Sequence, residues 1–267
     1  MKANTFQVIK SSTNILKDYK KKEITSQILF GETFVFSKQT KCFIYGLNLT
    51  DNYEGWVCSS DLGILPEFNF YVSEIRVNLL SKPEIKSEFI KYLPMRAKIK
   101  VINIDKNKVW AKMQLPKSCR FKFGYVPFNQ ILDKTKYEDD WVFFAEKFIG
   151  TPYRWGGRDS LGIDCSSLVQ LSLAFNGYYI PRDTCDQINY FCKHENFIVK
   201  RNVYPKIERG SIIFWDGHVA VAINDDTIIH ASAHHKKVVY ESLNEAIRRI
   251  NSNISIVKKN IKGEYGT

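Results

Sequence analysis

The sequence predicts an α+β domain at the carboxyl-terminal end of the chain, preceded by two small all-β domains. Two observations support this fold class. Before residue 137, short runs rich in Val, Ile, Phe and Tyr alternate with Asn, Asp and Gly, as expected for strands joined by turns. After residue 137, stretches with helical apolar spacing come first and apolar strand-like runs follow, which is typical of helices packed on an antiparallel sheet.

The first half of the chain contains an internal repeat. Residues 24–36, followed by Gly55-Trp-Val, are matched by residues 85–101, followed by Gly124-Tyr-Val. Each copy begins with mixed polar and apolar residues and ends in Gly-aromatic-Val, with room for roughly five short strands. We therefore predict one small β-barrel over residues 1–68 and a second over residues 69–136. The alternative is a single larger β-domain.

The third predicted domain, residues 137–267, begins with two helices. Carboxylates at 138–140 can cap a helix over residues 141–149, which Gly150 and Pro152 end. A second helix starts at Cys165 and ends at Asn176-Gly177. The remaining elements are strands over 211–215, 219–223, 227–231 and 237–240, and a helix over 243–250. We expect the helices to lie on one face of the sheet.

Composition narrows the class of protein. The 267 residues are 44% hydrophobic and 14% aromatic, enough for packed cores. No run approaches the roughly 18 apolar residues of a membrane span, and the first ten residues lack the apolar stretch of a signal peptide. Six cysteines without a Cys-x-x-Cys pair favour a reducing compartment. We expect a cytoplasmic monomer that does not bind membranes.

The formal net charge is +11, and its lysines are spread over the whole length. A nucleic-acid-binding face would concentrate them, so this distribution favours solubility over nucleic-acid binding. An attraction to acidic substrates remains compatible with the charge.

Cys165 is the candidate nucleophile. A cysteine that opens an apolar helix is more often a core residue, but here Trp155-Gly156-Gly157 and Gly162 form a closely approachable loop before it. Asp164 can cap the helix so that Cys165 points outward. Unpaired backbone N–H groups at a helix N-terminus favour an anion, so we expect a stabilised thiolate near neutral pH.

Two histidines can complete the chemistry. Acyl transfer by a thiol needs a base and a group that holds the base in the right tautomer. His218 opens an apolar strand, and His230 lies inside the next one. His230 alone reads more readily as a core histidine, yet neighbouring strands bring side chains together, and a contact between the imidazoles would orient His218.

These motifs together resemble the NlpC-type peptidases that cut bacterial cell-wall peptides. The resemblance covers roughly residues 137–258 and rests on Tyr153-x-Trp-Gly-Gly, Asp164-Cys-Ser, Pro181-Arg-Asp-Thr-x-x-Gln187, Gly217-His-Val and Ile229-His. It implies a papain-like α+β fold and a catalytic set of Cys165, His218 and His230. It also implies that Tyr153 assists at the oxyanion site. The sequence departs from the family pattern at Ser167 and at Gly210-Ser211, neither of which is in the catalytic set.

The two repeats resemble bacterial SH3-like domains. This order of domains resembles a subgroup that hydrolyses γ-D-glutamyl bonds to a diamino acid in muropeptides with a free N-terminal L-Ala. The resemblance implies peptidoglycan recycling, with a cell-wall peptide as the partner. It also implies a substrate pocket whose residues are Trp155, Asp164, Ser166, Asp183 and Thr184, with Glu23 and Tyr53 from the first barrel.

Other functions stay open at this point. A zinc site could use His230-x-x-x-His234 with His235 and Cys165, although this spacing on a strand and turn does not converge the side chains as a helix would. A non-catalytic wall-binding protein, an exported wall hydrolase and a thiol amidase or acyltransferase on the same fold are further alternatives. We expect no metal and no cofactor.

Overall fold

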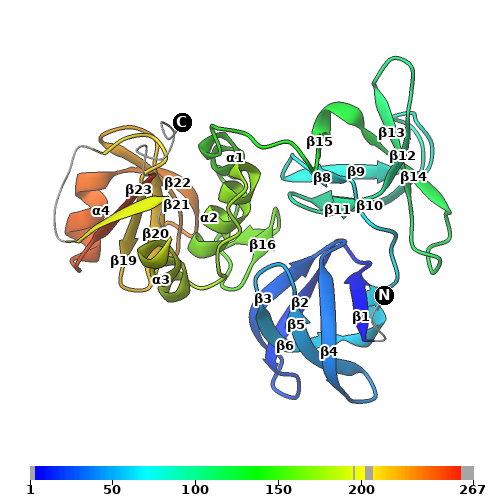
Figure 1. Ribbon diagram of the computed structural model, residues 1–267, viewed down its shortest axis with the longest axis horizontal. Helices are drawn as coiled ribbons and strands as arrows, with labels where there is room; N and C mark the ends of the chain where they lie inside the picture. The colour runs from blue at the N-terminus through cyan, green and yellow to red at the C-terminus, as the bar shows by residue number, and fades with distance from the viewer. Residues whose placement is uncertain (1–3, 195, 202–206, 260–267) are drawn as a thin grey trace, which may run out of the picture. The chain divides into compact units, whose positions relative to one another are not determined.

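The computed structural model describes residues 4–194, 196–201 and 207–259, and the chain forms two compact units (Figure 1). Unit 1 holds the residues up to 137 together with the short segment 155–161. Unit 2 holds residues 138–154 and the residues from 162 onward. No helix among the described residues is long and apolar enough to cross a membrane.

The first region of unit 1 is a seven-stranded antiparallel sheet with the order β3-β2-β6-β5-β4-β1-β7. Its strands are β1 (Thr5–Val8), β2 (Ser12–Asp18), β3 (Glu23–Leu29), β4 (Thr33–Gln39), β5 (Phe43–Asn48), β6 (Tyr53–Cys58) and β7 (Leu62–Gly63). Alternate residues face a core that includes Ile15, Phe34 and Val57. The sheet-rich region is confirmed, whereas a closed SH3-like barrel stays a prediction, because the described strand order runs open from β3 to β7.

The second region of unit 1 contains two smaller sheets, with the orders β10-β9-β14-β13-β12 and β11-β8-β15. The strands are β8 (Phe70–Val72), β9 (Arg76–Leu80), β10 (Phe89–Pro94), β11 (Lys98–Ile99), β12 (Val101–Ile104), β13 (Trp110–Gln114), β14 (Phe123–Pro127) and β15 (Ile131–Asp133). Phe30 of the first region is buried in the core of the second. A Cβ on Gly31 would lie 2.1 Å from the carbonyl oxygen of Lys98, so only glycine permits this close approach.

Unit 2 is built on a six-stranded antiparallel sheet with the order β18-β23-β19-β20-β21-β22 (Figure 1). Its strands are β18 (Phe197–Arg201), β19 (Ile212–Trp215), β20 (His218–Ala222), β21 (Thr227–Ser232), β22 (Lys237–Ser242) and β23 (Ser255–Lys259). The helices are α1 (Val142–Glu146), α2 (Cys165–Leu173), α3 (Thr184–Lys193) and α4 (Leu243–Ile250). Two short pieces flank residues 160 and 161: β16 (Arg158–Asp159) in unit 1 and β17 (Gly162–Ile163) in unit 2.

The predicted helices of unit 2 are confirmed at α2 and α4 and corrected at α1. The last turn of α2 tightens over residues 174–176 and ends at Gly177, whose φ of +88° suits glycine. Helix α1 is shorter than predicted and has Trp141 at its N-cap without a side-chain cap. Asp140, one of the predicted caps, binds Arg209 instead, with an Nη2–Oδ2 distance of 2.9 Å.

The helices do not share one face of the sheet, contrary to the prediction. Helix α4 covers one face, where Leu243 and Ala246 share a core with Ala220, Ala222 and Ile228. Helices α1 and α2 cover the opposite face (Figure 1). An antiparallel sheet whose strands are apolar on both faces, as the fully buried run from Val219 to Ala222 is, must be covered on both sides.

Candidate active site

Cys165 is the first residue of helix α2, and Asp164 caps the helix as predicted. The Asp164 backbone is extended, with φ −101° and ψ 174°, and its carboxylate accepts a hydrogen bond from the Ser167 N–H at 2.9 Å. Helix α2 packs against β20 and β21, which carry the two histidines. Cys165 is only 7% exposed, so the expected outward orientation is corrected: the cysteine is buried.

A buried guanidinium anchors the start of α2. Arg182 forms a bidentate pair with Asp164, with Nη2–Oδ2 at 2.5 Å and Nη1–Oδ1 at 3.1 Å, and also donates to Ser166 Oγ at 2.7 Å. Gln187 Nε2 donates to the Ser166 carbonyl at 3.0 Å and to the Pro181 carbonyl at 2.9 Å. The sequence motif contains Arg182 and Gln187, but sequence reasoning assigned neither a role. They hold the cap and the residue after the nucleophile.

The predicted contact between the two histidines is confirmed. His218 Nε2 lies 2.8 Å from His230 Nδ1, and the rings meet edge to face with an interplanar angle of 66°. The β20–β21 register pairs Val221 with Ile229. Continued by one residue, this register sets His230 opposite Ala220, so the two histidines are diagonal neighbours on one face of the sheet.

Sequence reasoning missed a third partner, Glu241. Its Oε2 lies 3.0 Å from His230 Nε2, a close contact that is bent away from the direction of the ring N–H. Arg249 of α4 holds both oxygens of this carboxylate, at 3.0 Å from Nε and 2.7 Å from Nη2. Nothing in the sequence marks Glu241, because β22 brings it to His230 through sheet pairing rather than through a local motif.

Burial sets the charges of the reacting groups. Burial, with Asp164 nearby, raises the pKa of the Cys165 thiol to about 12, although backbone N–H groups of Val219 and Ser166 oppose the rise. Burial lowers the pKa of His218 to about 4 and that of His230 to about 3. At neutral pH the resting site is therefore an uncharged thiol beside uncharged imidazoles, which corrects the expected thiolate.

Tyr153 lies close to the nucleophile. Its backbone N–H donates to the Lys236 carbonyl at 2.8 Å, and the residue bridges to Ile163 just before the α2 cap. Burial and then the nearby Cys165 and Asp164 raise the pKa of the Tyr153 phenol to about 12. The phenol keeps its proton at neutral pH and can donate a hydrogen bond, as an oxyanion donor must.

The remaining predicted pocket residues fall on both units. In unit 2, Asp183 is the N-cap of α3 and Thr184 is its first residue. In unit 1, Trp155 is 72% exposed and Tyr53 opens β6. Glu23, also in unit 1, is an exposed residue 3.8 Å from the Lys17 ammonium.

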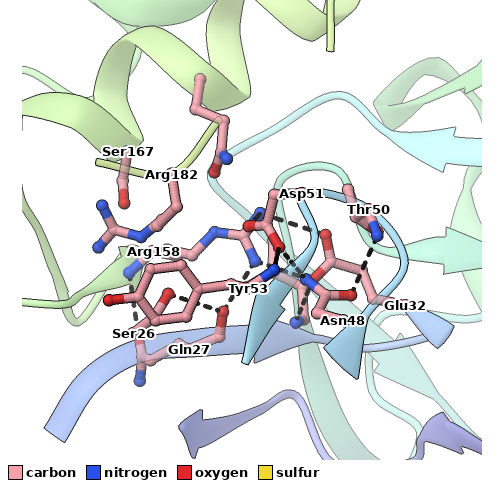
Figure 2. A network of polar contacts seen from close by, with 12 residues as sticks. Ser26, Gln27, Glu32, Asn48, Thr50, Asp51, Tyr53, Arg158, Ser167 and Arg182 are labelled. Carbon is pink, nitrogen blue, oxygen red and sulfur yellow. Dashed lines mark hydrogen bonds and ion pairs between the residues drawn. The ribbon is translucent and has the colours of Figure 1, made fainter. Parts of the chain in front are cut away.

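The segment before the nucleophile is fastened to unit 1 by a buried ion pair (Figure 2). Arg158 is 1% exposed; its Nη1 donates to Glu32 Oε2 and to the Gln27 carbonyl, both at 2.8 Å. Asp51 lies 3.9 Å from the same guanidinium. Although burial raises the pKa of Glu32, the charges of Arg158 and Lys98 prevail and hold it below its usual value.

The structure does not favour the zinc alternative. Among the described residues, the ligand atoms that lie within 4.8 Å of one another belong to His230, His235 and Glu241, and this group contains neither His234 nor Cys165. Both oxygens of Glu241 already bind the Arg249 guanidinium, and His235 Nδ1 lies 3.0 Å from Ser232 Oγ. A guanidinium on the only carboxylate of the group would repel a metal ion.

Known proteins share parts of this sequence. The NlpC/P60 family model matches residues 150–252. Dipeptidyl-peptidase 6 of Lysinibacillus sphaericus is 24% identical over 241 residues, which cover 84% of this chain and 85% of that protein. The gamma-D-glutamyl-L-lysine dipeptidyl-peptidase of Bacillus subtilis is 50% identical over 40 residues, or 15% of this chain and 14% of that protein.

The fold has a solved counterpart. The crystal structure of an NlpC/P60 family protein from Bacillus cereus matches with a TM-score of 0.75 and 17% identity, covering 90% of this chain and 94% of that chain. At this identity the likeness shows the fold. The family model spans Cys165 on α2, His218 on β20 and His230 on β21. Residues 150–252 therefore form a domain of the NlpC/P60 type.

Proposed function

We propose that this NlpC/P60 peptidase hydrolyses the γ-D-glutamyl bond to a diamino acid in cell-wall peptides that carry a free N-terminal L-Ala. The observation that carries the catalytic part of this proposal is the 2.8 Å contact between His218 and His230 beside the helix that begins at Cys165. The name of the relative from Bacillus subtilis supports the γ-D-glutamyl bond, and the name of the relative from Lysinibacillus sphaericus supports a dipeptidyl-peptidase.

The reaction starts from the uncharged thiol and imidazole. As the substrate carbonyl approaches, His218 takes the proton from Cys165, and the sulfur attacks the γ-carbonyl carbon of the D-glutamyl residue. The oxyanion receives hydrogen bonds from the Tyr153 phenol and from N–H groups at the start of α2. His218 then gives its proton to the leaving amine as the C–N bond breaks, and a thioester remains on Cys165.

Water completes the cycle. His218 removes a proton from the water as its oxygen attacks the thioester carbonyl, and the C–S bond breaks. The proton returns to the sulfur, the γ-carboxyl product leaves, and Cys165 and His218 are neutral again. A buried uncharged pair suits this sequence, because each charge appears only while substrate is bound and an oxyanion or amine is there to compensate it.

We propose that side chains from both units bind the peptide. Asp183 and Thr184, at the first turn of α3, follow Arg182, which is tied to the start of α2. Glu23 and Tyr53 are proposed to hold the free amine of L-Ala. The net charge of +11 favours the approach of peptides that are rich in carboxylates. The six cysteines are all free thiols, which supports a cytoplasmic role in peptidoglycan recycling.

The test is hydrolysis of L-Ala-γ-D-Glu-diamino acid, with products identified by mass spectrometry. We expect L-Ala-D-Glu and the free diamino acid from the full chain, and none from Cys165→Ala. Activity should be unchanged after dialysis against a chelator. The N-acetylated tripeptide should be cut more slowly, since acetylation removes the ammonium that Glu23 and Tyr53 are proposed to hold. Equal rates on both peptides would overturn the end recognition, and transfer products with an added amine would indicate an acyltransferase.

A further inference from the structure

We propose that Glu241 is a positioning residue that extends the catalytic set to Cys165, His218, His230 and Glu241, and that Arg249 tunes it. The proposal deepens the proposed function and rests on it. Glu241 touches no reacting atom and acts through the two histidines. Its contacts with His230 and Arg249 lie entirely within unit 2.

The sheet places the carboxylate beside the second imidazole. The register pairs Ile228 with Glu241 and His230 with Val239, so Glu241 and His230 are diagonal neighbours on one face of the β21–β22 pair. The Glu241 side chain is 7% exposed and that of His230 is fully buried. The carboxylate oxygen lies 3.0 Å from Nε2 of His230, while Nδ1 of the same ring meets His218.

This geometry selects the tautomers. A carboxylate offers only acceptors, so the 3.0 Å contact is repulsive unless Nε2 of His230 carries the proton. In a neutral ring Nδ1 is then the acceptor, and Nε2 of His218 must donate to it across 2.8 Å. Neutral His218 therefore has its lone pair on Nδ1. This is the atom left to take the Cys165 proton, and no proton needs to move to Glu241.

The same carboxylate also bears on the charge of His218. When His218 gains the thiol proton, the negative charge of Glu241 stabilises the new imidazolium, whereas the positive charge of Arg249 opposes it. The titratable groups that act on the histidine pair are His235 in the turn, Glu241 on β22 and Arg249 on α4. Cys165 on α2 lies at the backbone N–H of Val219, the residue after His218. The two charges that oppose each other belong to one ion pair with a shortest contact of 2.7 Å.

This opposition defines the experiment. The rate of Cys165 alkylation by iodoacetamide reports thiolate formation without any substrate, so it separates this proposal from the proposed function. We compare the full chain with Glu241→Gln, Arg249→Gln and the double variant from pH 2.5 to 9, with mass spectrometry to identify the labelled cysteine. Glu245→Gln and Arg248→Gln are matched controls, because both residues are exposed and lie on α4, the helix that carries Arg249.

We expect opposite effects from the two single variants. Glu241→Gln should slow alkylation at pH 7 about tenfold. It should also lower the midpoint of the acid limb of the alkylation-rate profile by about one pH unit, because the negative charge that stabilises the His218 imidazolium is removed. Arg249→Gln should speed alkylation and raise the acid limb by a similar amount. The double variant should lie within about threefold of the parent, as should both controls. In peptide hydrolysis, Glu241→Gln should lower kcat more than it raises KM.

Several outcomes would overturn the proposal. It fails if both single variants shift the acid limb in the same direction, or if Glu241→Gln leaves the limb unchanged while circular dichroism shows a native fold. If Glu241→Gln does not fold, Arg249→Gln and Arg249→Lys decide the question. Lysine keeps the positive charge, so Arg249→Lys should restore the parent profile. An upward shift of the acid limb in both Arg249 variants would mean that packing rather than charge is responsible.

Discussion

The two units each bury a polar cluster, and burial has opposite results in them. In unit 1, Arg158 and Glu32 are both ionised although neither is more than 1% exposed (Figure 2). In unit 2, His218 and His230 are buried but uncharged. Desolvation disfavours every charge, and a charge survives only where an opposite one lies close enough to compensate it. The Arg158 pair, at 2.8 Å and bidentate, meets that condition.

The difference separates a cluster that holds structure from one that moves protons. A bidentate buried ion pair resists titration and fixes the segment 155–161 on the first β-region. Neutral imidazoles in a hydrogen-bonded row can accept and return a proton at little cost in reorganisation. In unit 2 the charged pair of Glu241 and Arg249 contacts His230, the second histidine.

The largest effect should come from removing the nucleophile. Cys165→Ala should abolish hydrolysis, because no thioester can form, and should leave the fold intact since the change removes one atom from the side chain. Steady-state rates and circular dichroism measure both expectations. Activity that persists in this variant would remove Cys165 from the reaction.

Removing His218 should lower the rate of hydrolysis nearly as much. His218→Ala should lower kcat by about 10²-fold or more, the usual contribution of a general base. The double variant with Cys165→Ala should be no worse than the single ones, because groups that work as a unit are non-additive. A His218→Ala enzyme that keeps more than about a tenth of the parent rate would contradict its role as the base.

Breaking the Arg158 pair should reduce stability. Glu32→Gln leaves a buried guanidinium without its main counter-ion, which costs about 3–5 kcal/mol. Urea denaturation should show a lower midpoint for unit 1. In contrast, Glu88→Gln, which breaks an exposed pair with Arg120, should change the unfolding free energy by about 1 kcal/mol or less. Equal shifts in the two variants would mean that the buried pair is not what fastens the segment.

Acid should weaken both clusters over different ranges. The folded-state pKa values of His218 and His230, about 4 and about 3, lie below the ordinary 6.5, so unit 2 should lose stability as pH falls from 6.5 toward 4. Glu32 titrates below its ordinary 4.5, so the Arg158 pair stabilises unit 1 above about pH 4.5 and weakens below it. Denaturation midpoints from pH 8 to 3 measure this, and His230→Asn should flatten the upper part of the curve.

The smallest stability change should come from Glu23→Gln. This carboxylate is exposed and lies 3.8 Å from Lys17, so its loss should change the unfolding free energy by at most about 1 kcal/mol. If Glu23 binds the substrate amine, KM for the free tripeptide should nevertheless rise and KM for the N-acetylated peptide should not. No difference between the two peptides would remove Glu23 from the pocket.

Much of the fold and site could be predicted because the signals are local. The cap at Asp164, the stop at Gly177 and the apolar spacing over 243–250 each involve a few consecutive residues, and the structure confirms all three. Helix α3 was missed, since it buries only Gln187 and Phe191 and its apolar pattern is weak. Helix α1 is shorter than predicted, and Asp140, one of its predicted caps, binds Arg209, which is distant in sequence.

The sequence by itself identified the candidate nucleophile and the pair of histidines, since a capped helix start and two apolar strands can be recognised within short stretches. Tertiary structure alone decided the protonation of these groups, because desolvation depends on what the rest of the chain packs around them. It also decided the partners from distant elements: Arg158 meets a residue 126 positions away, and Glu241 meets His230 only through sheet register. Such contacts exist after the chain has folded, and no local pattern encodes them.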